Sequence, residues 1–276
     1  MTDFLNSFDK GTYDMVFSIG AACSCSSALR ASGLQFRSFP FDWVYGASLE
    51  ERAQMFCNSF CDWLPEKDML CIGEQIIESI PKMVYKNTVT GIVFNHDFPL
   101  NASFEKSYPV VRARYERRIS RLFDMIRKSG RVLVVHLALP NATNDYSDEY
   151  LIRVRNYIGD CFPGVTVHLL HLFNDNNVSL DNAVVKSPAP GILTARFCYN
   201  AFNSEHPYAA DIKLLCKFFR RVQVSNKHLT FFDFMNKWSD RHRILNHIVR
   251  FRLSSDGKQM IEIFRIKICS FKVNAN

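Results

Sequence analysis

The sequence predicts an α/β domain with a largely parallel central sheet flanked by helices, in a doubly wound, Rossmann-like arrangement. Short apolar segments bounded by glycine or proline, at 13–19, 131–139 and 165–170, have the composition of buried strands. Helical segments at 104–128 and 145–157 lie between them along the chain. This order and these lengths are typical of βαβ units, whose strands pair in parallel.

The N-terminal part begins with the strand at 13–19, which ends at Gly20. Pro40 excludes a regular helix around it. The other elements expected here are a helix over 26–32, an irregular stretch over 34–44, a helix from the N-cap Ser48 to about residue 60, a mixed region over 62–81, and a strand over 88–94 closed by residues 95–99.

The longest predicted helix, 104–128, has apolar residues at three- and four-residue spacing on one face and arginines on the other. The apolar positions are Tyr108, Val111, Tyr115, Ile119, Leu122 and Ile126, and the arginines are Arg112, Arg114, Arg117, Arg118 and Arg121. Beyond residue 170 the pattern predicts a strand over 191–199 and a helix over 209–221.

The character of the sequence changes near residue 240, so we expect an α/β domain over 1–240 and a small basic β-hairpin tail over 241–276. Residues 212–276 carry 14 Lys and Arg against 4 Asp and Glu. A basic segment of this kind attracts anionic surfaces, and we expect peripheral membrane contact through 241–276. The alternative is a solvated basic face without a partner. The chain has no zinc-finger spacing or RNA-binding signature, which argues against nucleic acid.

The composition favours a cytoplasmic protein, peripheral to the inner membrane if it contacts a membrane at all. The 276 residues are 47% hydrophobic, include no run of about twenty apolar residues, and begin without a signal-peptide pattern. Nine cysteines at irregular spacing do not suggest a disulfide framework. No metal or cofactor is expected, since the pair Cys23 and Cys25 lacks a second pair at finger spacing and no nucleotide-binding fingerprint is present.

The run Ser18-Ile-Gly20-Ala-Ala-Cys23 is the strongest candidate for chemistry. A buried strand ends here at a tight turn that feeds a helix, which places the turn cysteine near the positive end of the helix dipole. A cysteine in that position can be a reactive thiolate near neutral pH. Cys25 could compete for the role, and the alternative is that Cys23 merely packs as a small apolar residue.

His96 is the candidate general base, because it directly follows a predicted strand and lies beside Asp97. Asp42 or Asp97 could orient its imidazole, although a turn aspartate often bonds only its own backbone. We expect substrate contacts from Ser18, Gly20, Trp43 and Asn95.

Other polar residues are weaker candidates for the site. His136 lies inside an apolar strand and is expected to be structural, whereas His168 and His171 remain candidates near a strand end. His206 lies in a predicted loop, and Asn141, Asn144 and Asp145 could line a pocket or, more simply, cap the next helix.

Three motifs occur together: Ser18-Ile-Gly-Ala-Ala-Cys23, Ser38-Phe-Pro-Phe-Asp-Trp43 and Phe94-Asn-His-Asp-Phe98. With Tyr115-Glu-Arg-Arg-Ile119 and the strand at 131–136, they make the chain resemble, over roughly residues 12–175, a bacterial family of unknown function catalogued as putative papain-like cysteine peptidases. The resemblance implies that Cys23 is a nucleophile and His96 its general base. Separately, residues 258–273 resemble the short basic tails of bacterial capsule and lipopolysaccharide biosynthesis proteins.

Three functions follow from these observations and stay open. The first is a cysteine peptidase-like hydrolase or acyl transferase that acts on a peptide or a glycan-linked small substrate through Cys23 and His96. The second is a glycosyltransferase-like or accessory protein of bacterial surface polysaccharide biosynthesis. The third is a non-catalytic binding module in which Cys23 only packs.

Overall fold

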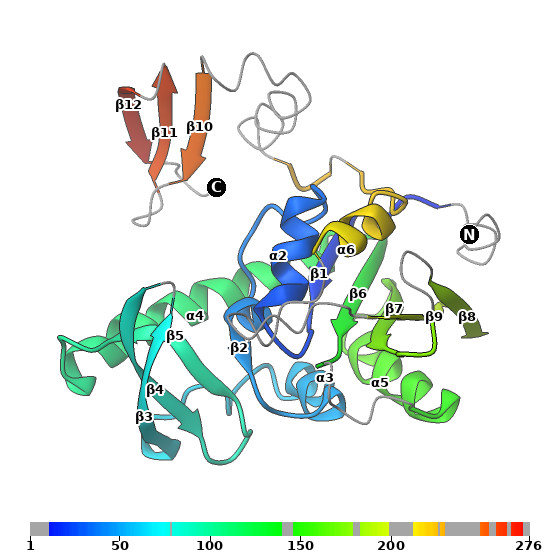
Figure 1. The fold of residues 1–276 in the computed structure, drawn as a ribbon, viewed down its shortest axis with the longest axis horizontal. Helices are drawn as coiled ribbons and strands as arrows, with labels where there is room; N and C mark the ends of the chain where they lie inside the picture. Colours follow the sequence, from blue (N-terminus) through cyan, green and yellow to red (C-terminus); the bar gives the residue numbers. More distant parts are fainter. Residues whose placement is uncertain are drawn as a thin grey trace. The chain divides into compact units, whose positions relative to one another are not determined.

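The computed structural model describes residues 11–77, 79–139, 146–178, 183–198, 212–225, 227–229, 249–253, 258–263 and 266–272. The chain divides into two compact units, residues 1–225 and 226–276. The first unit contains a mostly parallel sheet and an antiparallel sheet, and the second contains a separate antiparallel sheet (Figure 1). The domain boundary near residue 240 stays a prediction.

The mostly parallel sheet confirms the predicted α/β class. Its strands run in the order β1 (Met15–Ser18), β6 (Arg131–Leu137), β7 (Thr166–Asn174), β9 (Ile192–Phe197) and β8 (Val184–Ala189). All neighbouring strands pair in parallel except β8 and β9. The parallel strands described here follow chain order without the reversal of a doubly wound sheet, so the Rossmann-like arrangement is not confirmed.

Buried side chains lie on both faces of this sheet, as β6 shows. Val132 and Val134 belong to one apolar cluster, and Leu133 and Val135 belong to the other. The helices that contribute to the first cluster are α3 (Leu49–Cys57), α4 (Phe104–Arg127) and α5 (Asp148–Asp160), and those that contribute to the second are α2 (Cys23–Ala31) and α6 (Ile212–Phe219) (Figure 1).

The helix boundaries agree with the sequence patterns to within a few residues, and caps explain two of them. The hydroxyl of Ser48 accepts a hydrogen bond from the Glu51 backbone N–H at 3.2 Å, which confirms Ser48 as the N-cap of α3. The hydroxyl of Ser147 accepts from the N–H of Tyr150, so α5 begins at Asp148 rather than at the predicted residue 145.

The antiparallel sheet was only partly predicted. Its strands run in the order β2 (Val44–Tyr45), β5 (Val93–Pro99), β4 (Ile80–Asn87) and β3 (Met69–Ile77). The strand expected over 88–94 and the turn expected over 95–99 are wrong, because β5 begins at Val93 and runs through Pro99. The Asn87 side chain accepts hydrogen bonds from the backbone N–H groups of Val89 and Thr90, which shapes residues 88–91 into the turn instead.

The second unit is a three-stranded antiparallel sheet rather than a two-stranded hairpin. Its strands are β10 (Val249–Leu253), β11 (Lys258–Ile263) and β12 (Ile266–Lys272). The expected hairpin tail therefore contains a third strand, and Ile263 of β11 pairs with Ile266 of β12. Within the described residues, no helix is both long and apolar enough to cross a membrane.

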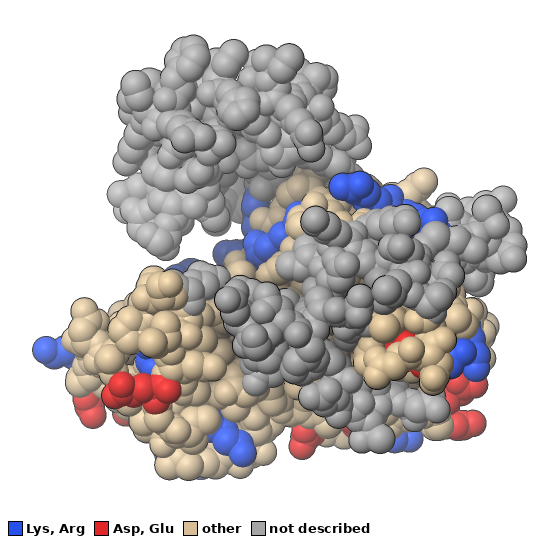
Figure 2. Space-filling model, in the orientation of Figure 1, with Lys and Arg blue, Asp and Glu red and all other residues tan. Residues whose placement is uncertain are grey.

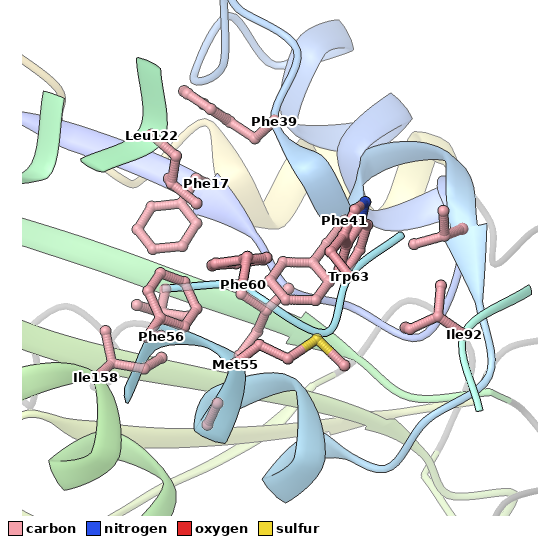
Figure 3. Packing of buried hydrophobic residues seen from close by; sticks show 14 of the residues in the cluster. Phe17, Phe39, Phe41, Met55, Phe56, Phe60, Trp63, Ile92, Leu122 and Ile158 are labelled. Carbon is pink, nitrogen blue, oxygen red and sulfur yellow. The ribbon is translucent and has the colours of Figure 1, made fainter. Parts of the chain in front are cut away.

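The larger apolar cluster is built around aromatic rings (Figure 3). The ring of Phe41 lies 5.3 Å from that of Phe60, 5.2 Å from that of Trp63 and 6.1 Å from that of Phe56, measured between centroids. Phe41 belongs to the short 3-10 helix η1 (Pro40–Trp43), so these contacts fix η1 against the core. Aromatic pairs of this kind add about 0.5–1.5 kcal/mol beyond the area they bury.

We expect the substitution Phe41→Ala to lower the free energy of unfolding by about 3–5 kcal/mol, because it leaves a cavity among these rings. The matched control is Ile76→Ala, since that side chain is 74% exposed and its loss should change stability by less than about 0.5 kcal/mol. Urea unfolding followed by tryptophan fluorescence measures both values. Equal losses in the two variants would contradict the assignment of η1 to the core.

Candidate functional site

Cys23 is the first residue of α2, three residues before the predicted start of that helix. The side chain of Cys23 is partly exposed. The N-cap residue, Ala22, makes no side-chain cap hydrogen bond, and the first turn of α2 contains no acidic residue. The hydroxyl of Ser26 lies 3.0 Å from the carbonyl oxygen of Cys23 and 2.9 Å from that of Asp42, so the first turn is anchored to η1. Cys23 therefore lies at the positive end of a helix dipole, in a first turn that contains no acidic residue.

The turn that precedes Cys23 is held by a buried arginine of α3. The Arg52 guanidinium donates to the carbonyl oxygens of Ile19 at 3.3 Å, Gly20 at 2.7 Å and Ala21 at 3.3 Å. It also donates to the carbonyl oxygen of Gly46, in the loop that follows β2. Arg52 was not predicted as a site residue, since a single charged residue in an amphipathic helix is expected to face solvent.

Gly20 of this turn is buried, and so are Ser18 before the turn and Cys25 in α2. The Ser18 hydroxyl accepts a hydrogen bond from the Gly20 N–H at 3.0 Å, and an added Cβ at Gly20 would lie 2.7 Å from that of Cys25. Burial raises the pKa of Cys25 to about 12, so this thiol is not ionised at neutral pH. Ser18 and Gly20, predicted to bind substrate, are thus observed to shape the turn, and Cys25 is a packed thiol.

Asp42 lies buried in η1, where its Oδ2 atom accepts three hydrogen bonds. The donors are Arg30 at 2.8 Å, the Gln35 amide at 2.7 Å and the Phe39 N–H at 2.9 Å. Desolvation raises the pKa of Asp42, with Arg30 as the main opposing influence. Asp42 therefore joins α2, the segment before η1 and η1 itself.

His96 lies in an irregular part of β5, next to η1. One residue of β4, Val84, faces the three residues Asn95–Asp97 of β5, because the register shifts there. Such bulges redirect side chains and are frequent beside active sites. The ring of His96 packs against that of Trp43 with 5.7 Å between centroids, and the Arg30 guanidinium carbon lies 5.7 Å from the same Trp43 ring.

Asp97 and Asn95, which flank His96, are buried in other contacts. The Asp97 carboxylate accepts from Arg114 at 3.0 Å and from the Tyr115 hydroxyl at 2.6 Å, which ties α4 to β5. Neither contact involves His96. Asn95, predicted to bind substrate, is 8% exposed and its amide lies 3.5 Å from the Gln75 side chain.

Two other histidines, His136 of β6 and His171 of β7, lie opposite each other in the parallel sheet. The Nδ1 atoms of His136 and His171 are 3.0 Å apart, and both rings are buried. Burial, then the charges of His171 and Arg52, holds the pKa of His136 well below its usual value. His168 lies farther back in β7, 2.8 Å from the Tyr13 hydroxyl. The remaining candidates from the sequence, Asn141, Asn144, Asp145 and His206, lie outside the described residues.

No group of three or more His, Cys, Asp or Glu side chains in the described ranges could hold a metal ion. A cavity of about 510 Å³ lies between α4 and the segment 60–67, and the predicted site residues do not line it. The structure thus brings Trp43 and His96 into contact and joins Cys23 to η1 through Ser26.

We expect Gly20→Ala to destabilise the protein by about 1–3 kcal/mol, because the new methyl group would overlap the Cys25 side chain. Gly130→Ala is the control, since its added Cβ would meet the nearest atom, Asp14 Oδ2, at an ordinary 3.5 Å. Urea unfolding of both variants tests this expectation. A Gly20→Ala variant as stable as the control would mean that the turn tolerates a side chain.

The comparisons with known proteins concern the part of the chain that carries these residues. A model of the family described as "Putative papain-like cysteine peptidase (DUF1796)" matches residues 14–152, half of the chain. The matched range includes Cys23, Asp42, Trp43 and His96. No curated protein and no solved structure matches. Because the family model matches half of the chain, the chain belongs to this family.

Proposed function

We propose that the protein is a thiol-dependent hydrolase or acyl transferase with Cys23 as its nucleophile. The observation that carries the proposal is the position of Cys23, partly exposed as the first residue of an uncapped helix whose preceding turn is held by Arg52. The helix dipole favours the thiolate, which is the nucleophilic form of cysteine. Membership of the family supports the same assignment.

In this proposal His96 is the general base and acid. His96 takes the thiol proton, the sulfur attacks a carbonyl carbon, and the carbonyl π electrons move to the oxygen. The tetrahedral intermediate collapses to a thioester as the leaving group accepts the proton from the imidazolium. Water, or another acceptor in a transferase, then attacks the thioester with His96 again acting as base, and the thiol is released.

Backbone N–H groups that follow Cys23 in the first turn of α2 would stabilise the oxyanion. Trp43 would position the imidazole by ring packing. We assign Asp42 and Asp97 as positioning residues, since Asp42 fixes the η1 helix that carries Trp43 and Asp97 fixes β5 beside His96. Because Cys25 is un-ionised at neutral pH, it does not compete with Cys23.

The substrate we propose is a peptide or a glycan-linked small molecule, without a cofactor. The basic C-terminal residues support a further proposal, that residues 241–276 hold the protein on the inner, anionic surface of a membrane. That setting suits surface polysaccharide biosynthesis, where a transferase-like or accessory role is the second candidate function. A binding module without catalysis is the third, and nucleic acid is not proposed as a partner.

We expect iodoacetamide at neutral pH to alkylate Cys23 much faster than the other eight cysteines. Peptide mass spectrometry over a time course measures each rate. Cys23→Ala should remove the fast phase, and His96→Gln should slow it. Cys57→Ala is the control because it removes another exposed thiol and should leave the fast phase unchanged. Equal labelling of Cys23 and Cys57 would defeat the proposed nucleophile.

We also expect the intact chain to sediment with vesicles that contain phosphatidylglycerol, and a chain that lacks residues 240–276 to remain in the supernatant. Vesicles of phosphatidylcholine alone are the control for charge. The unfolding transition of the shortened chain shows whether its first unit stays folded. Failure of the intact chain to sediment would rule out the membrane proposal.

A further inference from the structure

Six arginines gather where α2, α4 and the segment before η1 meet. This arginine cluster consists of Arg30, Arg37, Arg114, Arg117, Arg118 and Arg121. Arg121 lies at its centre: burial lowers its pKa, and so do the charges of four other members of the cluster. Figure 2 shows Lys and Arg side chains at the surface near α2 and α6 on the face drawn. Like charges so close to one another are unfavourable unless an anion compensates them.

Hydrogen bonds hold parts of the cluster in fixed positions. Arg30 donates to the carbonyl oxygen of Arg37 at 3.1 Å, and Arg121 donates to that of Ser38 at 3.2 Å. The guanidinium carbon of Arg118 lies 4.9 Å from the centre of the Tyr115 ring. The arginine groups are therefore partly ordered before any ligand binds, which lowers the entropic cost of binding one.

The described carboxylates near the cluster form ion pairs with two of its arginines. Asp42 pairs with Arg30 and Asp97 pairs with Arg114. The described residues provide no ion pair for the other three cluster arginines of α4, which are Arg117, Arg118 and Arg121. Two buried nitrogens, Arg30 Nε and Arg118 Nη1, also have no hydrogen-bond partner in the described part of the chain. Unused buried donors are costly, so they favour a ligand that accepts hydrogen bonds.

The cluster adjoins the site proposed above. Arg30 contacts the Trp43 ring, which in turn packs against His96. Arg114 binds Asp97, the residue after His96 in β5. An anion held by the cluster would lie on the Trp43 and His96 side of the site.

We infer that the arginine cluster binds an oxyanionic group, a phosphate or a carboxylate, of the substrate. Guanidinium groups suit such oxyanions because their planar donors make paired, charge-assisted hydrogen bonds. The inference rests on the proposed function for its reaction, but binding by the cluster does not require Cys23 to react. The substrate of the proposed hydrolase or transferase would therefore carry an anionic group.

Titration calorimetry on the full-length chain at low ionic strength tests the inference, with inorganic pyrophosphate and citrate as probes. The double variant Arg117→Gln/Arg118→Gln should bind the better probe at least about tenfold more weakly than the wild type, which corresponds to about 1.4 kcal/mol. The control Arg112→Gln/Arg127→Gln removes the same charge from the same helix, at exposed arginines outside the cluster, and should bind like the wild type. If the cluster variant unfolds, Arg117→Glu is compared with Arg127→Glu instead.

Tighter binding of pyrophosphate or of citrate would show whether phosphate or carboxylate is preferred, and either result supports the inference. Equal losses in cluster and control variants would overturn it, as would no binding of either probe at millimolar concentration. Cys23→Ala should bind the probes normally. If the wild type binds the probes as expected but Cys23 is alkylated slowly, the proposed reaction is rejected and the anion site is retained.

Discussion

The geometry around Cys23 depends on one buried charge. The Arg52 guanidinium is fully buried, and all its hydrogen bonds are to main-chain carbonyl oxygens of two loops, 19–21 and 46–47. Burial lowers the pKa of Arg52 to about 9, which shows how unfavourable its environment is for a cation. Hydrogen bonds to a charged group are worth about 1.5–3 kcal/mol each, and they must stay in place to offset the desolvation. The turn before Cys23 is consequently fixed by the requirement to solvate this ion.

Asp42 is a second buried charged residue near Cys25. The charge of Asp42 raises the pKa of Cys25 and the charge of Arg52 lowers it, so both ions act on this buried thiol. Arg52 organises the carbonyl groups of its two loops, whereas Asp42 organises donors from α2 and from the segment before η1. Because each ion contacts more than one segment of the chain, substitution of either residue would disturb several elements together.

Patterns local in sequence predicted the parallel sheet and most helices, since apolar periodicity over 104–128 and the Ser48 cap act within a few residues. The turn before Cys23 was also readable, because a buried strand ended at Gly20. The bounds of β5 were predicted wrongly for two reasons. The Asn87 side chain accepts backbone hydrogen bonds that place the turn directly after β4. The bulge at Asn95–Asp97 depends on pairing with β4, which is distant from any local sequence pattern. The contacts of Arg52 could not be predicted for a similar reason. Its partners are backbone oxygens, which every residue has, so no residue type in the sequence indicates them.

Cys23 and His96 belong to different elements, and the short helix η1 contacts both of these elements. Here Cys23 begins α2 beside the parallel sheet, and His96 belongs to the antiparallel sheet. The short helix η1 contacts both α2, which begins at Cys23, and β5, which contains His96, and it also contacts α4. The proposed chemistry therefore depends on the Phe-Pro-Phe-Asp-Trp segment, where Asp42 holds α2 in place and Trp43 meets His96.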